Sequence, residues 1–532
     1  MAAPHVSTRS SRDLSGSVYL ITSNGRMLSL PIPTKSQRDP LNWSKKKRAG
    51  ALTTVVLFAV NGLLLVQAPS LMFRGLKEEY SAKDTKPFRL DTLVSAPTLF
   101  MGVGAFVWVP LSLAIGRRPV FLLCAVILLL GTVWAAIAGS FYQLLAAICL
   151  QGLAEGLATS TMLLMVIDLT FIHQRPQAIA MLWSIGGAIT LALLSLVPFI
   201  TNDGISWRRI YSIGSISCGI SLILAFFFYP ETYFLRPAVA FDGHILVQSA
   251  TEKIKLYEEW ADVPGGKMLP DIPEKSRWVA IVKQLSLHAR VKGGWRAMLV
   301  CYPQAALCIL NPLVFWVALL NAINFGGMLS IGMTYAGVLS AEPYSFSMNI
   351  ISWVNLSAAF GSFVAWPASG LMIARICRRL AMRNGGVRDA EHYLPAFALP
   401  ILAGASSVVL YGLTAQRNWH WILIYISYAL NAFAFAGLST ANTLWITEAF
   451  PRWASAGIIV VGGGSYIASF GLSYAIYPWI MSQGFERANV QIGVMLLVVG
   501  GIVIPIAFWG KKLRQYIHGK WGMLERGALR PQ

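Results

Sequence analysis

Charged side chains are scarce in this sequence. Asp, Glu, Lys and Arg make up only 12% of its 532 residues, and 56% of the residues are hydrophobic. A typical soluble domain carries about 25% charged residues. The chain therefore lacks the polar groups that a water-facing surface of this length needs, which excludes a soluble globular protein. Its 26 Phe and 18 Trp also exclude a disordered chain.

Motifs for phosphate and metal binding are missing too. The sequence has no G-x-x-x-x-G-K-S/T loop, which leaves ATP-driven transport without support. Its seven His are scattered, without pairs at metal-ligand spacing inside the apolar segments. Its six Cys do not share an outer loop, so no disulfide framework is expected. We therefore expect no enzyme activity, no metal and no cofactor. A channel or a receptor is also not expected, because neither predicts two six-helix halves.

Long apolar runs dominate the chain instead. A membrane-crossing helix needs about 20 mostly apolar residues. Only a helix satisfies all backbone hydrogen bonds within one crossing, so each such run predicts a transmembrane helix and the chain an all-α polytopic membrane protein. The twelve runs are 50–73, 92–115, 119–139, 142–168, 178–200, 209–230, 311–336, 346–373, 395–415, 419–447, 455–481 and 489–510.

A polar stretch separates six runs from the other six, which predicts two pseudo-symmetric six-helix bundles. Inside this stretch, apolar residues recur at helical spacing over 275–295 beside a basic flank, as in a helix that lies on a membrane surface or in a solvated linker helix. The predicted domains are a disordered cytosolic tail (1–49), the first bundle (50–230), a cytosolic central loop with an interfacial helix (231–310), the second bundle (311–510) and a cytosolic C-terminal tail (511–532).

Basic residues are distributed unevenly between the two sides of these runs. If the N-terminus is cytosolic, 34 of the 43 Lys and Arg lie in the tails, the central loop and the inner turns, and 9 lie in outer loops. Lys and Arg beside membrane spans mark the cytosolic side. Both termini are therefore predicted to be cytosolic. The net charge of +20 reports this orientation, and we expect no nucleic-acid partner.

Acidic and basic residues recur at corresponding ends of the two halves. The fourth run ends in Asp168, followed by Arg175, and the tenth ends in Glu448, followed by Arg452. This echo is typical of the duplicated bundles of secondary transporters, although any inner helix end attracts such residues. We expect these residues either to form gating pairs or only to mark helix ends, and the basic turn after the second run either to fasten the halves or only to set topology. The gating candidates are Arg117, Arg118, Asp168, Arg175, Glu448 and Arg452.

Five short strings, in the right order, carry a family resemblance. They are Asp39–Ser44 (DPLNWS), Gly116–Pro119 (GRRP), Asp168–Pro176 (DLTFIHQRP), Ser206–Tyr211 (SWRRIY) and Pro230–Tyr233 (PETY). Together they resemble the fungal drug:proton antiporter-like branch of the major facilitator superfamily, which implies export of secondary metabolites or toxic compounds. The chain departs from the family motifs at Leu113 and Ile148, where an acid and an Arg are usual, and it lacks the Gly-Pro signature of antiporters in the fifth run.

One acidic residue lies near the middle of a run. Glu155 is 13 residues from both Tyr142 and Asp168, hence about 20 Å from each end of the helix. An ionisable group in lipid is a functional candidate, because inserting it costs about 2.5–3.5 kcal/mol. We predict that Glu155 exchanges a proton during transport. The alternative is a neutral Glu held by an interhelical hydrogen bond.

Amide and indole side chains inside the runs are the candidates for substrate contact. Substrate sites of such transporters lie at midplane depth between the two halves, although amides in membrane helices also hold helices together. With no Lys or Arg deep inside the runs, the substrate is expected to be hydrophobic and uncharged. The cavity candidates are Asn61, Gln67, Gln151, Trp183, Asn321, Asn324, Asn355, Asn431, Asn442 and Trp445.

The predicted function is that of a secondary active transporter that moves a small hydrophobic organic molecule, by efflux of a secondary metabolite or toxic compound. Proton-coupled uptake of a nutrient or metabolite is the alternative, which the missing antiporter signatures keep open. The expected partners are the small-molecule substrate, protons and the lipid bilayer. We expect a monomer, a multi-pass protein of the fungal plasma membrane.

Overall fold

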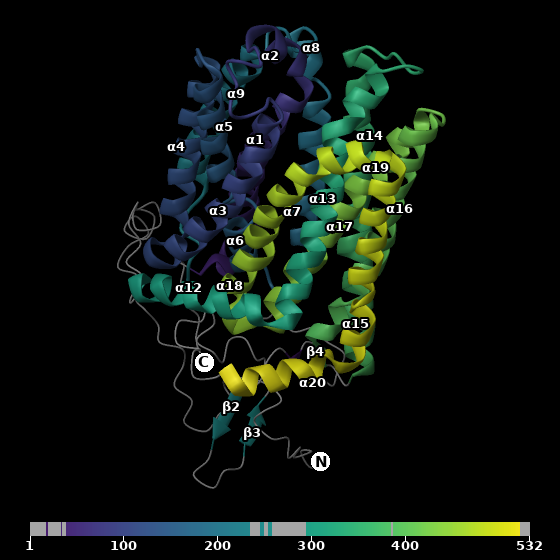
Figure 1. Ribbon diagram of the computed structural model, residues 1–532. Helices are drawn as coiled ribbons and strands as arrows, with labels where there is room; N and C mark the ends of the chain where they lie inside the picture. Colours follow the sequence, from purple (N-terminus) through teal and green to yellow (C-terminus); the bar gives the residue numbers. More distant parts are fainter. Residues whose placement is uncertain are drawn as a thin grey trace.

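The structure is a computed structural model, and it describes residues 17–19, 33, 39–234, 245–248, 254–257, 294–384 and 387–521. Long helices dominate these residues, and the two halves of the chain form two bundles side by side (Figure 1). The predicted all-α membrane fold is confirmed. We call the end of the molecule that carries the turns 116, 169–174 and 450–453 the base (the lower end in Figure 1), and the opposite end the top.

The first half begins where Ser44 caps a helix, since its Oγ accepts a hydrogen bond from the backbone N–H of Lys47 at 3.3 Å. The tight turn between its third and fourth helices is made by Gly116 at φ 100°, a conformation that favours glycine. The helices are α1 (Lys45–Gln67), α2 (Phe73–Glu79), α3 (Thr92–Ile115), α4 (Arg117–Ala136), α5 (Phe141–Glu155), α6 (Thr161–Asp168), α7 (Arg175–Leu194), α8 (Val197–Thr201) and α9 (Arg208–Phe228).

In the second half, two spans contain π-helical segments, Pro367–Met372 between α14 and α15 and Ile459–Gly464 between α18 and α19. Such segments often occur at functional sites. The helices of this half are α12 (Gly294–Leu310), α13 (Pro312–Ser340), α14 (Met348–Trp366), α15 (Ile373–Arg383), α16 (Pro395–Arg417), α17 (Ile422–Ala449), α18 (Ala454–Ile458), α19 (Ser465–Gly501) and α20 (Val503–Trp521).

Four short strands form two antiparallel pairs outside the helical bundles. Strand β1 (Ser17–Tyr19) pairs with β4 (Val387–Asp389), so that a piece of the N-terminal tail is joined to the segment between α15 and α16. Strand β2 (Ile245–Gln248) pairs with β3 (Ile254–Tyr257) in the central segment. The predicted surface helix over 275–295 lies outside the described residues except for its last two, which begin α12. Helix α12 runs along the base beside α3 and α18 (Figure 1).

Ten helices in the described part of the chain are long and apolar enough to cross a membrane, against twelve predicted runs. The predicted run 142–168 is divided into α5 and α6 by a turn, so α5 counts as a shorter apolar helix. The runs 455–481 and 489–510 fall into one long helical stretch, Ala454–Ile517, which Gly484 interrupts with φ 81°. The differences therefore lie in where helices break, and not in which segments are apolar.

The outer surface of the bundles is apolar. Leu130 on α4, Ile216 on α9 and Phe360 on α14 are each more than 60% exposed. Apolar patches of this extent on a water-facing protein would drive aggregation, whereas lipid is a suitable solvent for them. The molecule is therefore a multi-pass membrane protein.

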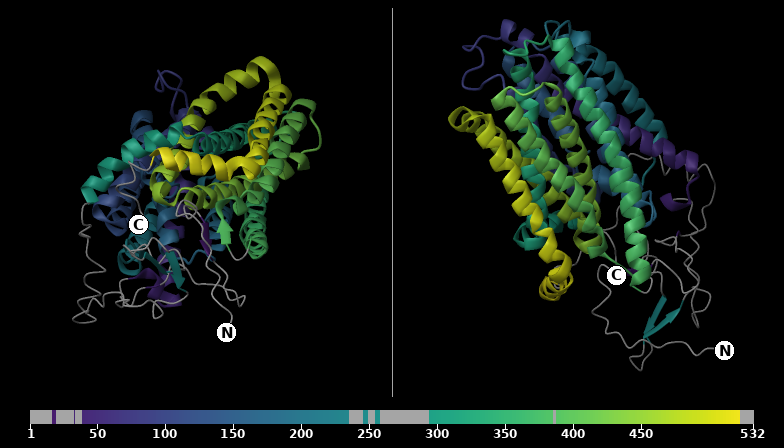
Figure 2. Two further views of the ribbon diagram at one scale, coloured as in Figure 1. Left: turned by 90° about the horizontal axis from the view of Figure 1, so that it is seen from below. Right: turned by 90° about the vertical axis from the view of Figure 1, so that its right-hand side faces the viewer.

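The two halves meet along two seams. Helix α3 packs against α19 and the preceding π-helical segment, and α7 packs against α14 and α17 (Figure 2). The first seam is close because of glycine: a Cβ on Gly102 would lie 2.8 Å from the backbone oxygen of Gly463. The two halves are therefore in close contact along both seams.

Candidate functional site

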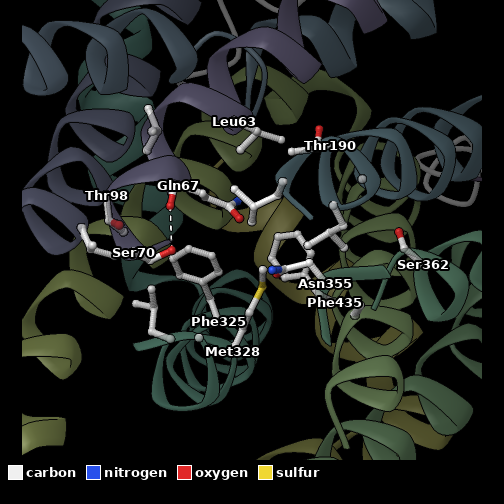
Figure 3. Close-up of a pocket in the computed structure, with 18 of the residues that line it drawn as sticks. Leu63, Gln67, Ser70, Thr98, Thr190, Phe325, Met328, Asn355, Ser362 and Phe435 are labelled. Atoms are coloured by element: carbon white, nitrogen blue, oxygen red, sulfur yellow. Dashed lines mark hydrogen bonds between the residues drawn. The ribbon is translucent and has the colours of Figure 1, made fainter. Parts of the chain in front are cut away.

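A cavity of about 100 Å³ lies between the two halves (Figure 3). Side chains from α1, α3 and α7 form one wall, and side chains from α13, α14, α17 and α19 form the other. Among the described residues that line it, none is charged. We call this space the central cavity, and its polar lining residues are Gln67, Ser70, Thr98, Thr190, Tyr335, Asn355, Ser362, Tyr428 and Tyr466.

Aromatic rings form a continuous chain across the central cavity from one half to the other. Trp183 on α7 meets Phe435 on α17 edge-on, with ring centroids 5.9 Å apart. Phe435 contacts Phe325 at 5.6 Å, and Phe325 contacts Tyr466 at 4.6 Å. Edge-to-face and tilted geometries of this kind are favourable for aromatic pairs. Flat apolar surfaces are thus available to a ligand from both halves.

Three of the predicted cavity residues line this space, namely Gln67, Trp183 and Asn355. The Asn355 Nδ2 donates to the Tyr335 hydroxyl at 3.0 Å, while its buried Oδ1 has no hydrogen-bond partner among the described residues. The Trp183 Nε1 is likewise buried without a partner in this part of the chain. One acceptor and one donor without a partner in the described part of the chain therefore belong to residues that line this uncharged cavity, as expected of a small-molecule site.

A second, smaller cavity of about 20 Å³ lies next to the central cavity and shares Trp183 and Tyr466 with it. The predicted residues Asn321 and Asn442 line it, and the Asn442 Nδ2 donates to the Asn321 Oδ1 at 3.0 Å. Its volume suffices for about one water molecule. The remaining lining comes from residues near the base, such as Ile446. The two cavities are thus neighbours that share two aromatic side chains.

The five other predicted cavity residues do not line the central cavity, and that expectation is corrected: they are Asn61, Gln151, Asn324, Asn431 and Trp445. Three of these amides bond to neighbouring helices instead: Asn61 to Ser217 on α9, Gln151 to Thr132 on α4, and Asn431 to Ser407 on α16. Amides in membrane helices commonly serve in this way. The Trp445 ring packs edge-on against Trp316, with centroids 5.9 Å apart.

The two halves are joined at the base by a buried ion pair. The Arg175 Nη1 donates to the Glu448 Oε1 at 2.6 Å, and the two side chains are only 2% and 6% exposed. We expected Arg175 beside Asp168, and Glu448 beside Arg452; the described pair instead crosses from α7 to α17. The side chain of Arg452 lies outside the described residues. Breaking a buried pair by removing one partner costs about 3–5 kcal/mol, so this contact is a strong link between the two halves at the base.

Arg117 and Arg118 make their described hydrogen bonds within the first half, which corrects the expectation that they fasten the two halves together. The Arg117 Nε lies 3.4 Å from the Asp168 Oδ2, which joins the turn between α3 and α4 to the end of α6. The Arg118 guanidinium donates to the backbone oxygens of Phe226, in the last turn of α9, and of Tyr229, directly after it. These residues therefore hold the base of the first bundle together.

Glu231 completes this cluster, and we did not predict it. Its Oε1 and Oε2 accept the backbone N–H groups of Arg117 and Arg118 at 3.0 and 3.1 Å, so that one carboxyl group caps the start of α4. Burial raises the pKa of Glu231, and the hydrogen bonds from Tyr233, Arg117 and Arg118 oppose that rise. In the sequence, Glu231 is part of the string Pro230–Tyr233, which resembles the family, but that resemblance indicates no role for Glu231.

Glu155 lies in the interior of the first bundle and not in the central cavity. It is fully buried, and neither carboxyl oxygen has a hydrogen-bond partner among the described residues. It is the last residue of α5, and its carboxyl group lies so close to α1 that a Cβ on Gly62 would come within 1.8 Å of its Oε2. The hydroxyl of Tyr466, which lines both cavities, is within electrostatic range of this carboxyl group.

No metal site is found in the described part of the chain: no group of three or more His, Cys, Asp or Glu could hold an ion there. Each of the six cysteines is buried and free. The described residues thus offer an uncharged cavity, one unpartnered carboxyl group and an ion pair between the halves.

A sequence profile of the Major Facilitator Superfamily matches residues 50–470. The chain belongs to this superfamily. Among its relatives are an uncharacterized MFS-type transporter of Schizosaccharomyces pombe, 22% identical over 93% of this chain and 90% of that protein, and the efflux pump radE of Floropilus chiversii, 22% identical over 90% and 83%. The resemblance to major facilitator transporters of an efflux-like branch is confirmed.

The fold of this major facilitator protein is also found among solved structures. The proton:xylose symporter XylE, with bound 6-bromo-6-deoxy-D-glucose, superposes with a TM-score of 0.58, at 14% sequence identity, over 86% of this chain and 96% of that one. The identity is low, so the likeness extends to the fold alone.

Sequence reasoning missed most of the cavity wall of this major facilitator protein. Phe325, Met328, Leu329 and Gly332 of α13 all line the cavity, and their i, i+3, i+4, i+7 spacing places them on one face of the helix. The sequence shows this spacing, but it does not show which face of the helix lines the cavity and which faces lipid, because both faces are apolar.

Proposed function

We propose that this chain is a secondary active transporter for a small, hydrophobic, uncharged organic molecule, and that its function is export of a secondary metabolite or a toxic compound. The absence of charge among the described residues of the central cavity carries this proposal, because a charged cargo would require a buried partner of opposite sign. The name of the relative radE, an efflux pump, supports export.

The proposed setting is the plasma membrane, with the base and both termini in the cytosol, as the distribution of Lys and Arg suggests. In that orientation the Arg175–Glu448 pair closes the cytosolic side. A Cys introduced at Ser81 should react with an impermeant thiol reagent on intact cells, and one at Ser249 should not. The reverse labelling pattern would place the base outside. Since one chain supplies both walls of the cavity, we propose a monomer as the working unit.

Export is tested with Nile red, an uncharged fluorescent aromatic dye. Yeast cells that lack their own drug pumps should retain less of the dye when they express this protein. The Asn355→Ala change should reduce dye export, because Asn355 lines the central cavity. Asn431→Ala is the matched control, since this buried amide lies outside the cavity and bonds to Ser407. Higher dye retention in expressing cells would contradict export and favour uptake. Equal effects of the two changes would contradict the assignment of the central cavity as the dye site.

Protons are the proposed coupling ion, with Glu155 as the group that carries them. The support is geometric: this carboxyl group is fully buried, has no hydrogen-bond partner among the described residues and lies against α1 at Gly62. A buried acid of this kind can exist charged or neutral depending on which side it is exposed to. Its test is given among the predictions below.

A further inference from the structure

A separate cavity lies at the base between the two halves, and it shares no lining residue with the central cavity or the small cavity beside it. Its volume is about 280 Å³. His173, Pro176 and Gln177 line it from the first half, and residues of α15 and Arg388 line it from the second. We call it the basal cavity. Gln177, Arg375 and Arg378 are exposed, so that the cavity is accessible from the base.

The lining of the basal cavity is strongly basic. Arg375, Arg378, Arg388 and His173 contribute to it, and no acidic residue does in the described part of the chain. Arg388 is buried, with 6% of its surface exposed, and its Nη2 has no hydrogen-bond partner among the described residues. The Nδ1 of His173 is also buried without a partner there. Two unsatisfied buried polar atoms in one cavity call for a ligand.

Acidic residues near this cavity already have basic partners. Glu448 binds Arg175 at 2.6 Å and also lies within electrostatic range of Arg388, so that one carboxylate is shared by two guanidinium groups. Asp389 accepts a hydrogen bond from Lys511 at 3.2 Å, and Glu391 pairs with Arg514 at 3.0 Å. The cavity therefore retains an excess of positive charge, which an anion would neutralise.

We propose that the basal cavity binds a phosphate-type dianion, either as free phosphate or as the headgroup of an anionic phospholipid. Guanidinium groups match the geometry of phosphate oxygens and bind them by charge-assisted hydrogen bonds. The volume lies near the lower end of the range of about 300–1,000 Å³ for small-molecule sites, so it suits a phosphate group with a small substituent.

Binding of such an anion has a consequence for the conformation of the transporter. His173 lies before α7 in the first half, and Arg388 lies between α15 and α16 in the second, and the Arg388 Nη1 donates to the Ile172 backbone oxygen at 3.4 Å. An anion held between them binds only when the base is closed. By linkage, the anion then stabilises the closed base and slows its opening. This proposal does not depend on which molecule the central cavity carries.

The binding test uses the full-length protein in nanodiscs of phosphatidylcholine. Inorganic phosphate should raise the midpoint of thermal unfolding in a saturable way, relative to chloride at the same ionic strength. Arg375→Gln with Arg378→Gln should weaken the apparent affinity at least about ten-fold, as expected for the loss of charge-assisted hydrogen bonds. Arg379→Gln with Arg383→Gln removes the same charge from the same helix outside the cavity and should leave the affinity unchanged.

The source of the anion is distinguished by a second set of nanodiscs that contain phosphatidic acid. Stabilisation by inorganic phosphate in phosphatidylcholine alone assigns a free anion, and stabilisation only by phosphatidic acid, lost in the Arg375/Arg378 pair, assigns a lipid headgroup. No stabilisation in either set, or equal losses in the two variant pairs, overturns the proposal.

The conformational consequence has its own readout. Thr443 lines the small cavity near the base, so a Cys placed there reacts with a thiol reagent from the base only when the base opens. Phosphate or phosphatidic acid, whichever binds, should slow that reaction in the Thr443→Cys protein but not when the Arg375/Arg378 changes are also present. An unchanged rate with the anion bound would overturn the link to base closure.

Discussion

Arg175 and Glu448, which lie 273 positions apart in the sequence, form a buried ion pair with an N···O distance of 2.6 Å. Arg175 begins α7 and Glu448 lies in the last turn of α17, so the pair joins the two halves where each leaves the bundle at the base. Four aromatic side chains, Trp183, Phe325, Phe435 and Tyr466, line the central cavity. We predict that a ligand in this cavity leaves towards the base only after the ion pair has separated.

Removing one charge of this pair should open the base. Glu448→Gln leaves Arg175 buried without its counter-ion, which favours conformations in which Arg175 reaches water. A Cys at Ser439, in the small cavity, should then react with a thiol reagent several-fold faster than in the otherwise native protein. Glu486→Gln is the control, since it breaks the exposed pair with Arg417 inside the second half. Equal reactivity in the two variants would show that the Arg175–Glu448 pair does not limit opening.

Glu155→Gln should abolish coupling to protons while retaining exchange of substrate. The change mimics the protonated acid at nearly the same volume, and the cavity itself is not altered. In proteoliposomes, accumulation of Nile red driven by a pH gradient should disappear, and dye exchange at equal pH should persist; Glu155→Asp should retain some coupling. Accumulation that survives in the Gln variant would leave Glu155 as a structural residue and direct the search for coupling to Asp168 or Glu448.

Glu231→Ala should destabilise the protein, because two backbone N–H groups at the start of α4 lose their acceptor. Each unsatisfied buried group costs about 1–3 kcal/mol. Glu231→Gln keeps one acceptor oxygen and removes a charge that burial disfavours, so its loss should be smaller. Thermal unfolding followed by intrinsic fluorescence checks this order. A Gln variant as unstable as the Ala variant would show that a neutral acceptor oxygen is not enough and that the cap requires the carboxylate.

Anion binding in the basal cavity should strengthen as the pH falls. Burial, and in second place the charge of Arg388, lowers the pKa of His173, so the empty site holds a neutral imidazole near pH 7. A bound anion favours the protonated form, hence binding takes up a proton and the affinity rises as the pH drops towards the pKa of the empty site. The other titratable groups that line the site are Arg375, Arg378, Arg388 and Cys377. Glu448 and His392 lie within electrostatic range of Arg388.

Sulfate is the probe for this dependence, because it does not titrate near neutral pH. His173→Gln should bind sulfate with an affinity that hardly changes between mildly acidic and neutral pH. A native protein whose sulfate affinity is flat over this range, or falls with acidification, would contradict the assignment of His173 to the site.

The fold was largely predictable, and the site only partly. The apolar runs were sufficient to predict the helices, because a segment that crosses lipid must satisfy its own backbone hydrogen bonds and a helix does so. The break after Glu155 was missed although the turn contains Gly156, Thr159 and Ser160, because these residues lie inside an otherwise apolar run. We expected Arg175 to pair with Asp168 because the two are close in the sequence, but its partner Glu448 lies in the other half of the chain. Asn61 and Asn355 look alike in sequence, and only packing shows that the first bonds to Ser217 while the second lines the cavity.

The most direct test of this account measures the two ends of the molecule together by pulsed electron paramagnetic resonance. Spin labels at Gln174 and Arg379 report on the base, and labels at Asn202 and Glu342 report on the top. The native protein should show a short base distance, and Glu448→Gln should add a population with a longer base distance and a shorter top distance. A base distance that stays unchanged in Glu448→Gln, or two distances that lengthen together, would contradict the claim that the Arg175–Glu448 pair holds this transporter closed at the base.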